Sequence, residues 1–249
     1  MSGHSKWSTI KHKKAAVDAR RGKLFTKLIR ELTSAAKTGG GDQEANPRLR
    51  TAIAAARGAN MPADTIQRAI QKGTGELPGE TYEEVTYEGY GVGGVAVFVD
   101  VLTDNRNRTV AEIRHLFAKN GGNLGENGCV AWMFDRIGLI TVGVDQIEED
   151  DLLELVLESG GDDLTVDDDL YEIRTAPEAF EDVRSALEAR GLTFGVAEIT
   201  MMPQNTVKVE AKQAEQVIRL MDALEDHDDV RQAYANFDIS DEILAALAG

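Results

Sequence analysis

The chain has 249 residues, of which 42% are hydrophobic and 28% are charged, a composition that is typical of a folded protein and excludes a disordered one. At roughly 100–200 residues per domain, this length predicts two or three small domains. The sequence begins without a secretory signal, contains no apolar run of about 18 residues and has a single cysteine. We therefore expect a cytoplasmic protein with no disulfide and no membrane partner.

Charge is distributed unevenly along the chain. The net charge is −16, yet residues 1–75 contain 15 Lys and Arg against 5 Asp and Glu, which is a net charge of +10. Residues 76–249 contain the other 12 Lys and Arg and the other 38 Asp and Glu, which is a net charge of −26. Because the acidic part repels phosphate, this segregation indicates a polyanionic partner for the basic part alone.

Three short helices are predicted in the N-terminal third. Residues 13–37 contain no proline, and their apolar side chains fall on one side of a helix with the cations on the other. Glycines at 39–41 end this helix. An Asn-Pro pair predicts a second helix that runs from 47 to about 60, and a Met-Pro pair predicts a third that stops near 73. The apolar stripes of the three helices predict a small bundle.

Strands alternate with helices after residue 79. Strands at 83–90 and 94–102 are expected to flank a glycine-rich turn, and a helix is expected at 108–120, where Thr109 and Glu112 have the spacing of a capping box. A further strand is expected at 130–135. The elements expected next are strands at 139–144, 164–166, 171–175 and 193–201 and helices at 148–159 and 177–190.

The order of these last elements, β-α-β-β-α-β, is the split pattern of ferredoxin-like domains. This unit is complete by itself, and a strand, a helix and a strand follow it between 207 and 237, so we expect it to be inserted into the preceding domain. The sequence thus predicts an α+β protein of three domains. They are an N-terminal three-helix bundle with a basic arm (1–79), a discontinuous α/β domain (80–137 plus 203–249) and an inserted ferredoxin-like α/β domain (138–202).

The basic arm and the first helix form the candidate nucleic-acid site. Residues 5–14 mix lysines with one tryptophan and small hydroxyl residues, so the cations can contact phosphates while Trp7 stacks on an unpaired base, an interaction that contributes roughly 1–3 kcal/mol. The alternative is a solvated tail with Trp7 packed against the bundle. Cations continue onto the polar face of the helix, which favours binding. The residues expected to bind are Lys6, Trp7, Lys11, His12, Lys13, Lys14, Arg20, Arg21, Lys23, Lys27 and Arg30.

A second candidate is the segment 104–109, between a strand and a helix. Arg106 and Arg108, with two asparagines at a helix N-terminus, can bind phosphates or base edges. Alternatively, Asn and Asp cap the helix while the two arginines pair with acidic residues of the body. The sequence leaves both alternatives open.

The remaining motifs do not predict a cofactor site, a metal site or a catalytic site. Residues 89–94 contain G-x-G-x-x-G, but a strand follows them where a dinucleotide site needs a helix, so we expect a hairpin turn. The four histidines and Cys129 lack metal-ligand spacing, and Cys129 is expected to be a small buried thiol. No catalytic triad can be assembled from the sequence. We expect no enzyme activity, no cofactor, no metal and no small-molecule substrate.

Several separate motifs, in order, resemble those of the YebC family. They are MSGHSKW (1–7), IKHK (10–13), NMP (60–62), YEGYG (87–91), TDNRNRT (103–109) and GGNLG (121–125). The resemblance implies three domains and a non-enzymatic regulator of gene expression. Bacterial members are described as DNA-binding transcriptional regulators. Others, among them relatives of the mitochondrial translational activator of cytochrome c oxidase, are described as translation factors that relieve stalls at proline-rich stretches or activate particular messages.

Two functions follow from these observations. In the first, a translation factor inserts its arm into ribosomal RNA and eases stalled, proline-rich synthesis, while its acidic body meets ribosomal proteins. In the second, a transcriptional regulator reads duplex DNA, which usually needs a helix-turn-helix with a turn of about 3–4 residues. The connection at 38–45 is longer than that, and this favours RNA. A pure protein-interaction scaffold would leave the basic segment unexplained.

Overall fold

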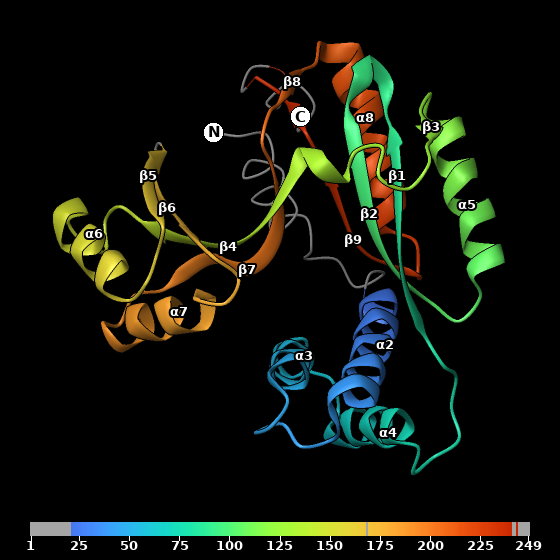
Figure 1. Cartoon of the computed structure of the whole chain (residues 1–249), viewed down its shortest axis with the longest axis horizontal. Coiled ribbons are helices and arrows are strands. Elements are labelled where there is room, and N and C mark those ends of the chain that lie inside the picture. Colours follow the sequence, from blue (N-terminus) through green and yellow to red (C-terminus); the bar gives the residue numbers. More distant parts are fainter. Residues whose placement is uncertain (1–20, 168, 241–242, 244–249) are drawn as a thin grey trace. The chain divides into compact units, whose positions relative to one another are not determined.

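The computed structural model describes residues 21–167, 169–240 and 243, which form two compact units (Figure 1). The first unit contains the described residues up to Ala131 together with Val209–Ala235 and residue 243. The second contains Trp132–Lys208 and Asn236–Ser240. Within these described residues, no helix combines the length and the apolar character that crossing a bilayer requires.

Three helices form the bundle of the first unit: α2 (Arg21–Gly39), α3 (Pro47–Gly58) and α4 (Ala63–Thr74). The Asn46 side chain accepts a hydrogen bond from the backbone N–H of Leu49, which confirms the predicted start of α3. Beyond α4, Gly75 takes a positive φ of 83°, a conformation that glycine adopts at low cost. The buried core of the bundle comprises Leu32, Ala35, Ala36, Leu49, Ala52, Ile53, Ala56, Met61, Ile66, Ala69 and Ile70.

A four-stranded antiparallel sheet completes the first unit. Its strands are β1 (Glu83–Tyr90), β2 (Ala96–Thr103), β3 (Asn123–Leu124) and β9 (Val230–Ala235), in the order β3-β1-β2-β9. Helices α5 (Arg106–Lys119) and α8 (Ala211–Glu225) contact each other and the sheet. The chain turns between β1 and β2 at Val92–Gly94, and a strand follows, so the glycine-rich motif is the predicted hairpin turn.

The second unit is ferredoxin-like, as predicted. Its elements are β4 (Phe134–Gly143), α6 (Glu149–Glu158), β5 (Asp163–Asp167), β6 (Leu170–Thr175), α7 (Phe180–Ala189) and β7 (Phe194–Pro203). All pairings in its sheet are antiparallel, in the order β5-β6-β4-β7. A short parallel pair, β8 (Val207–Lys208) and β10 (Phe237–Asp238), also belongs to this unit. Since β9 of the first sheet comes later in the chain than β7, the ferredoxin-like domain is inserted into the other α/β domain. The predicted domain boundaries remain predictions.

One predicted strand is wrong. We expected separate strands at 130–135 and 139–144, but Ala131–Met133 form a short 3-10 turn and β4 then runs unbroken through Gly138. A Cβ atom at Gly138 would lie 2.7 Å from a ring carbon of Phe180, so this glycine allows α7 to approach the strand closely. It does not interrupt the strand.

The start of α5 also differs from the prediction. Asn105 caps the helix by accepting a hydrogen bond from the backbone N–H of Arg108 at 3.1 Å. Thr109, the predicted cap, lies inside the helix, and its hydroxyl group contacts Thr103 and Asp229 instead. The capping box fails because Asn105 already supplies the acceptor that the first turn needs.

Candidate nucleic-acid interface

Most of the predicted arm lies outside the described residues. Lys6, Trp7, Lys11, His12, Lys13, Lys14 and Arg20 all belong to this part of the chain. Arg21 begins α2, and only its backbone is described. The described part of the candidate site is therefore the polar side of α2, together with α3, α4 and the segment before α5.

Three predicted site residues lie on one side of α2, at positions i, i+4 and i+7. We call Lys23, Lys27 and Arg30 the basic face of α2. This face contacts the last residue of α8 and the residues that follow it. The ammonium group of Lys23 donates to the carbonyl oxygen of Asp226 at 3.1 Å, and that of Lys27 donates to the carbonyl oxygen of Glu225. The last carbonyl groups of a helix lack partners within it and carry partial negative charge, so cations stabilise them.

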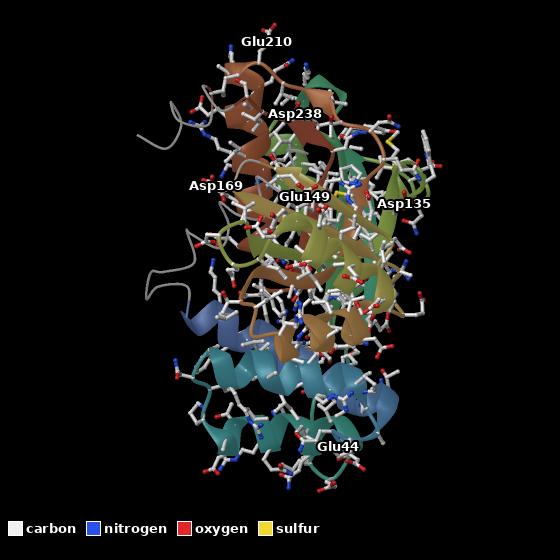
Figure 2. The ribbon with its side chains drawn as sticks, turned by 90° about the vertical axis from the view of Figure 1, so that its left-hand side faces the viewer. Glu44, Asp135, Glu149, Asp169, Glu210 and Asp238 are labelled. Carbon is white, nitrogen blue, oxygen red and sulfur yellow. The ribbon has the colours of Figure 1, made fainter. Side chains whose placement is uncertain are left out.

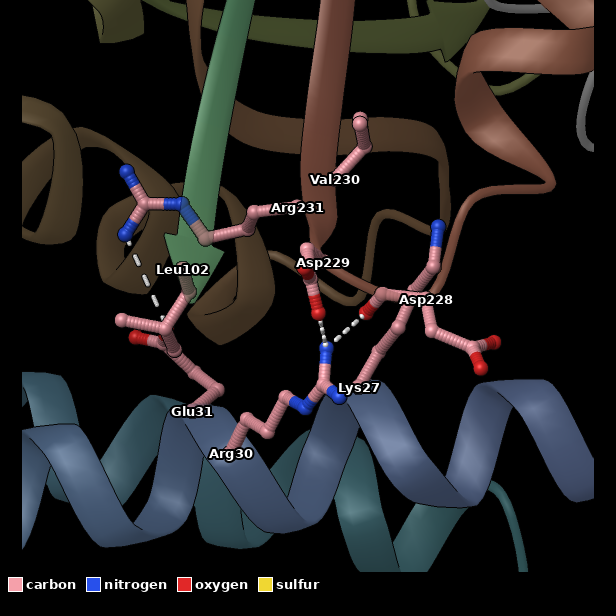
Figure 3. A pocket seen from close by; sticks show the side chains of 8 residues that line it. All are labelled: Lys27, Arg30, Glu31, Leu102, Asp228, Asp229, Val230 and Arg231. Carbon is pink, nitrogen blue, oxygen red and sulfur yellow. Dashed lines mark hydrogen bonds and ion pairs between the residues drawn. The ribbon is translucent and has the colours of Figure 1, made fainter. Parts of the chain in front are cut away.

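Arg30 extends the same contact into a buried position. Its guanidinium group donates to the carbonyl oxygen of Asp228 at 2.6 Å and to the carboxylate of Asp229, as Figure 3 shows. The Arg30 side chain is 14% exposed and that of Asp229 is 2% exposed. Tyr82 also packs against Arg30, with the guanidinium carbon 5.6 Å from the ring centroid. Arg30 thus ties α2 to the strand that begins at Val230.

Asp229 is the centre of this cluster. Its carboxylate accepts hydrogen bonds from the hydroxyl groups of Thr103 (3.1 Å) and Thr109 (2.5 Å) and from the guanidinium group of Arg108 (2.7 Å). Burial by itself would raise the pKa of Asp229. The hydrogen bonds from Thr109 and Arg108, with the charge of Arg30, outweigh burial and lower this pKa to about 2. Asp229 is therefore ionised at neutral pH.

Arg108 pairs with acidic residues, which is one of the two alternatives that the sequence left open for the segment 104–109. It pairs with Asp104 at 2.8 Å as well as with Asp229, and Glu112 lies 3.9 Å away. Its hydrogen bonds to Asp229 and Asp104 raise its pKa above the ordinary arginine value. Both arginines are exposed at the start of α5, but Arg106 has no ion-pair partner among the described residues. The two arginines of the motif therefore have different surroundings.

A second group of ion pairs joins the bundle to the sheet. Arg231 lies 3.5 Å from a carboxylate oxygen of Glu31, 3.9 Å from one of Glu84 and 3.2 Å from one of Asp100. Arg48 on α3 donates to Glu31 at 2.7 Å and to Glu84 at 2.5 Å. Cations and anions alternate across this contact, so each carboxylate has a neighbouring guanidinium group.

A small cleft separates α2 from the start of β9 (Figure 3). Its lining residues are Lys27, Arg30, Glu31, Leu102, Asp228, Asp229, Val230 and Arg231. The free space inside has room for about one water molecule. A phosphate group cannot enter between the basic face and its own partners unless those partners move.

Other cations of the bundle are exposed. Lys37, Arg57, Arg68 and Lys72 have no ion-pair partner within the described chain. Arg68 and Lys72 are one turn apart on α4, opposite its buried side. The backbone of α2 at Lys37 lies beside α4 at Gly73, where an added Cβ atom would be 3.1 Å from the Lys37 nitrogen. Arg57, Arg68 and Lys72 were not predicted as site residues, although each lies outside the apolar stripe of its helix.

Three groups that resemble a metal site are held by hydrogen bonds and ion pairs with one another and with neighbouring residues. Ligand atoms of Glu112, His227 and Asp229 lie within 4.8 Å of one another. The Nδ1 atom of His227 accepts the backbone N–H of Asp229 at 3.1 Å, so its Nε2 atom carries the proton and donates to Glu112 at 2.9 Å. The Asp229 carboxylate is bound by two guanidinium groups, which would repel a cation.

Cys129 lies beside a buried carboxylate, and its prediction needs a correction. It is half-buried, not fully buried as expected. Burial, followed by the charge of Glu88, raises the pKa of Cys129, so this thiol stays protonated at neutral pH and is a poor nucleophile. Glu88 accepts backbone hydrogen bonds from Gly128, Val130 and Ala131 at 2.6–2.7 Å, which shapes the loop.

Acidic residues dominate the second unit. Residues 132–208 contain 19 Asp and Glu against 5 Lys and Arg. Asp135, Glu149 and Asp169 are labelled among them in Figure 2. Two of the five cations, Arg174 and Arg184, pair with glutamates of their own elements. This unit offers little positive charge to a polyanion.

Comparison with known families agrees with the order of these domains. Residues 5–76 match the model of the TACO1/YebC protein N-terminal domain, and residues 82–237 match that of the TACO1/YebC second and third domain. The chain belongs to the TACO1/YebC family. The resemblance inferred from the motifs is confirmed, and the two matched ranges extend over most of this TACO1/YebC chain.

Close relatives carry the name of regulators. A probable transcriptional regulatory protein of Syntrophobacter fumaroxidans is 61% identical over 249 residues, which is 100% of both chains. Another, from Geobacter sulfurreducens, is 59% identical over 247 residues, covering 99% of this chain and 100% of the relative. A crystal structure of a conserved hypothetical protein from Aquifex aeolicus has a TM-score of 0.83 and 52% identity, covering 94% of this chain and 97% of that one. This likeness supports the α+β fold described above.

Proposed function

We propose that this TACO1/YebC protein is a non-enzymatic, cytoplasmic regulator of gene expression that binds nucleic acid through its basic N-terminal third. The observation that carries the proposal is the segregation of charge. Residues 1–75 have a net charge of +10, whereas the ferredoxin-like unit is strongly acidic. The regulatory names of close relatives support the same class of function.

The proposed surface contains the arm and the exposed cations of the bundle. Arg30 and Arg108 hold Asp229 in this arrangement, so we assign them a structural role. Lys23 and Lys27 contribute only when they exchange their present partners. Phosphate contacts then come mainly from Lys6, Lys11, His12, Lys13, Lys14, Arg20 and Arg21, with Lys37, Arg57, Arg68, Lys72 and Arg106 at the edges and Trp7 stacking on a base.

RNA is the preferred ligand in this proposal, and ribosomal RNA its preferred source. The connection between α2 and α3 runs over residues 40–46, which is longer than the turn of a helix-turn-helix. A strongly acidic unit is compatible with a ribosome if it faces basic ribosomal proteins. The finer function is then that of a translation factor that eases stalled, proline-rich synthesis. The alternative, a DNA-binding transcriptional regulator, is favoured by the names of the relatives.

Sedimentation of cell lysate through sucrose at low and high salt separates these functions. Comigration with ribosomes at low salt that is lost at high salt supports the translation factor. Protein that stays free of ribosomes and protects a defined promoter segment supports the DNA-binding alternative. Protein that stays free of ribosomes and binds neither RNA nor DNA refutes the proposal.

A triple variant tests the arm directly. We expect Lys11→Glu, Lys13→Glu and Lys14→Glu together to abolish comigration. The matched control changes three exposed cations elsewhere, Arg190→Glu, Lys208→Glu and Lys212→Glu, which alters the net charge equally. Equal loss in both variants would mean that net charge, and not the arm, determines binding.

A further inference from the structure

The basic face of α2 is already occupied by oxygen atoms of the chain itself. We call residues 225–229 the acidic segment; four of its five residues are Asp or Glu. We propose that the acidic segment is a built-in competitor, which nucleic acid must displace from Lys23 and Lys27 in order to bind this face. The inference rests on the proposed function, because it concerns how the same nucleic-acid site is regulated.

In this contact a row of cations along α2 binds oxygen atoms, as it would along a nucleic-acid backbone. Lys23, Lys27 and Arg30 each place a nitrogen on an oxygen of the acidic segment. Oxygen atoms supplied by a nucleic-acid backbone would satisfy Lys23 and Lys27 through charge-assisted hydrogen bonds. The cleft beside Lys27 has no room for such a group while the acidic segment is in place. Binding of one therefore excludes binding of the other at these positions.

The two ends of the contact differ in how easily they open. At the outer end the side chains of Lys23 and Asp226 are 49% and 58% exposed, and their charged atoms are 3.8 Å apart. Exposed pairs of this kind add little stability and exchange readily. At the inner end Asp229 is buried and Arg30 is only 14% exposed, so opening this pair would leave an unpaired charge. The Arg30–Asp229 pair, which we call the pivot, therefore stays closed while the outer part of the acidic segment is displaced.

Competition also couples the two parts of the first unit. The acidic segment connects α8 to β9 of the sheet, whereas the basic face belongs to the bundle. A nucleic acid that binds Lys23 and Lys27 releases the end of α8 from α2. Because coupling between two sites is reciprocal, a partner that holds the end of α8 against α2 lowers the affinity for nucleic acid. Nucleic-acid binding by the bundle is thereby transmitted to the α/β domain.

The test compares two variants of the full chain that lose the same charge. Asp226→Asn with Asp228→Asn neutralises the exposed part of the acidic segment and leaves the pivot intact. Glu154→Gln with Glu158→Gln changes two exposed carboxylates of α6 as the matched control. The probes are a fluorescent 20-nucleotide single-stranded RNA and a duplex DNA of the same length, titrated at fixed salt. We expect the first variant to bind about threefold to tenfold more tightly than the control.

Hydrogen exchange supplies a second readout that net charge does not affect. Saturating the wild-type protein with the RNA should make the amides of the acidic segment exchange faster, because the segment no longer packs against α2. Equal affinities of the two variants, or unchanged or slower exchange in the acidic segment, would overturn the competition while the proposed function stands. Failure of the wild-type chain to bind either probe would overturn both.

Discussion

Replacing Asp229 with Asn tests how the bundle is held on the sheet. The substitution keeps the shape of the side chain but removes the charge that Arg30 and Arg108 share. The carboxylate has a pKa of about 2 where 3.8 is ordinary, a difference that corresponds to about 2.4 kcal/mol. Breaking a buried ion pair costs about 3–5 kcal/mol, so we expect the free energy of unfolding of the first unit to fall by about 2–4 kcal/mol.

Urea unfolding followed by circular dichroism measures this loss. The matched control is Asp226→Asn, which removes an exposed partner of Lys23 and should cost less than about 0.5 kcal/mol. If Asp229→Asn unfolds at the same urea concentration as the control, the cluster around Asp229 does not stabilise the protein in the way described here.

The stability difference between wild type and Asp229→Asn should depend on pH. Because folding lowers the pKa of Asp229, its contribution is fully present above about pH 4 and is lost as the pH falls toward 2. The difference in unfolding free energy between wild type and Asp229→Asn should therefore be constant near neutral pH and shrink below about pH 4. A difference that grows on acidification would contradict the assignment of the low pKa to this carboxylate.

Three further predictions concern the surroundings of the site. Changing Arg57, Arg68 and Lys72 to Gln should reduce the slope of log affinity against log salt by about 0.7 for each phosphate of single-stranded RNA that these cations neutralise; an unchanged slope would remove them from the interface. Glu88→Ala should cost about 1–3 kcal/mol in urea unfolding, because three amide groups lose their acceptor; no loss would mean that water replaces it. Gly73→Ala should lower the melting temperature, since its Cβ atom would overlap a backbone carbonyl oxygen of α2; an unchanged melting temperature would show that the helices separate freely.

Local signals in the sequence predicted most of the fold. An Asn-Pro pair placed the start of α3 correctly, because both residue types satisfy needs of a helix N-terminus that do not depend on the rest of the protein. The element order predicted the ferredoxin-like domain for a similar reason. The break that we predicted in the strand near Gly138 is wrong. This glycine makes room for Phe180 of a later helix, which is a tertiary contact that no local pattern contains.

The site was harder to predict than the fold. Helical periodicity put Lys23, Lys27 and Arg30 on one face, and the structure agrees. What periodicity cannot supply is the neighbour of that face, because Asp229 lies 199 positions beyond Arg30 in the chain. The acidic composition of residues 76–249 was the only signal in the sequence that these cations could be neutralised by the protein itself.

Ultraviolet cross-linking of the full chain to RNA, followed by peptide mapping, tests the central claim most directly. The account predicts that cross-linked peptides come from residues 1–80, with Trp7 among them, and that their yield falls as salt is raised. Cross-links concentrated in residues 132–208, or a yield that does not respond to salt, would contradict it.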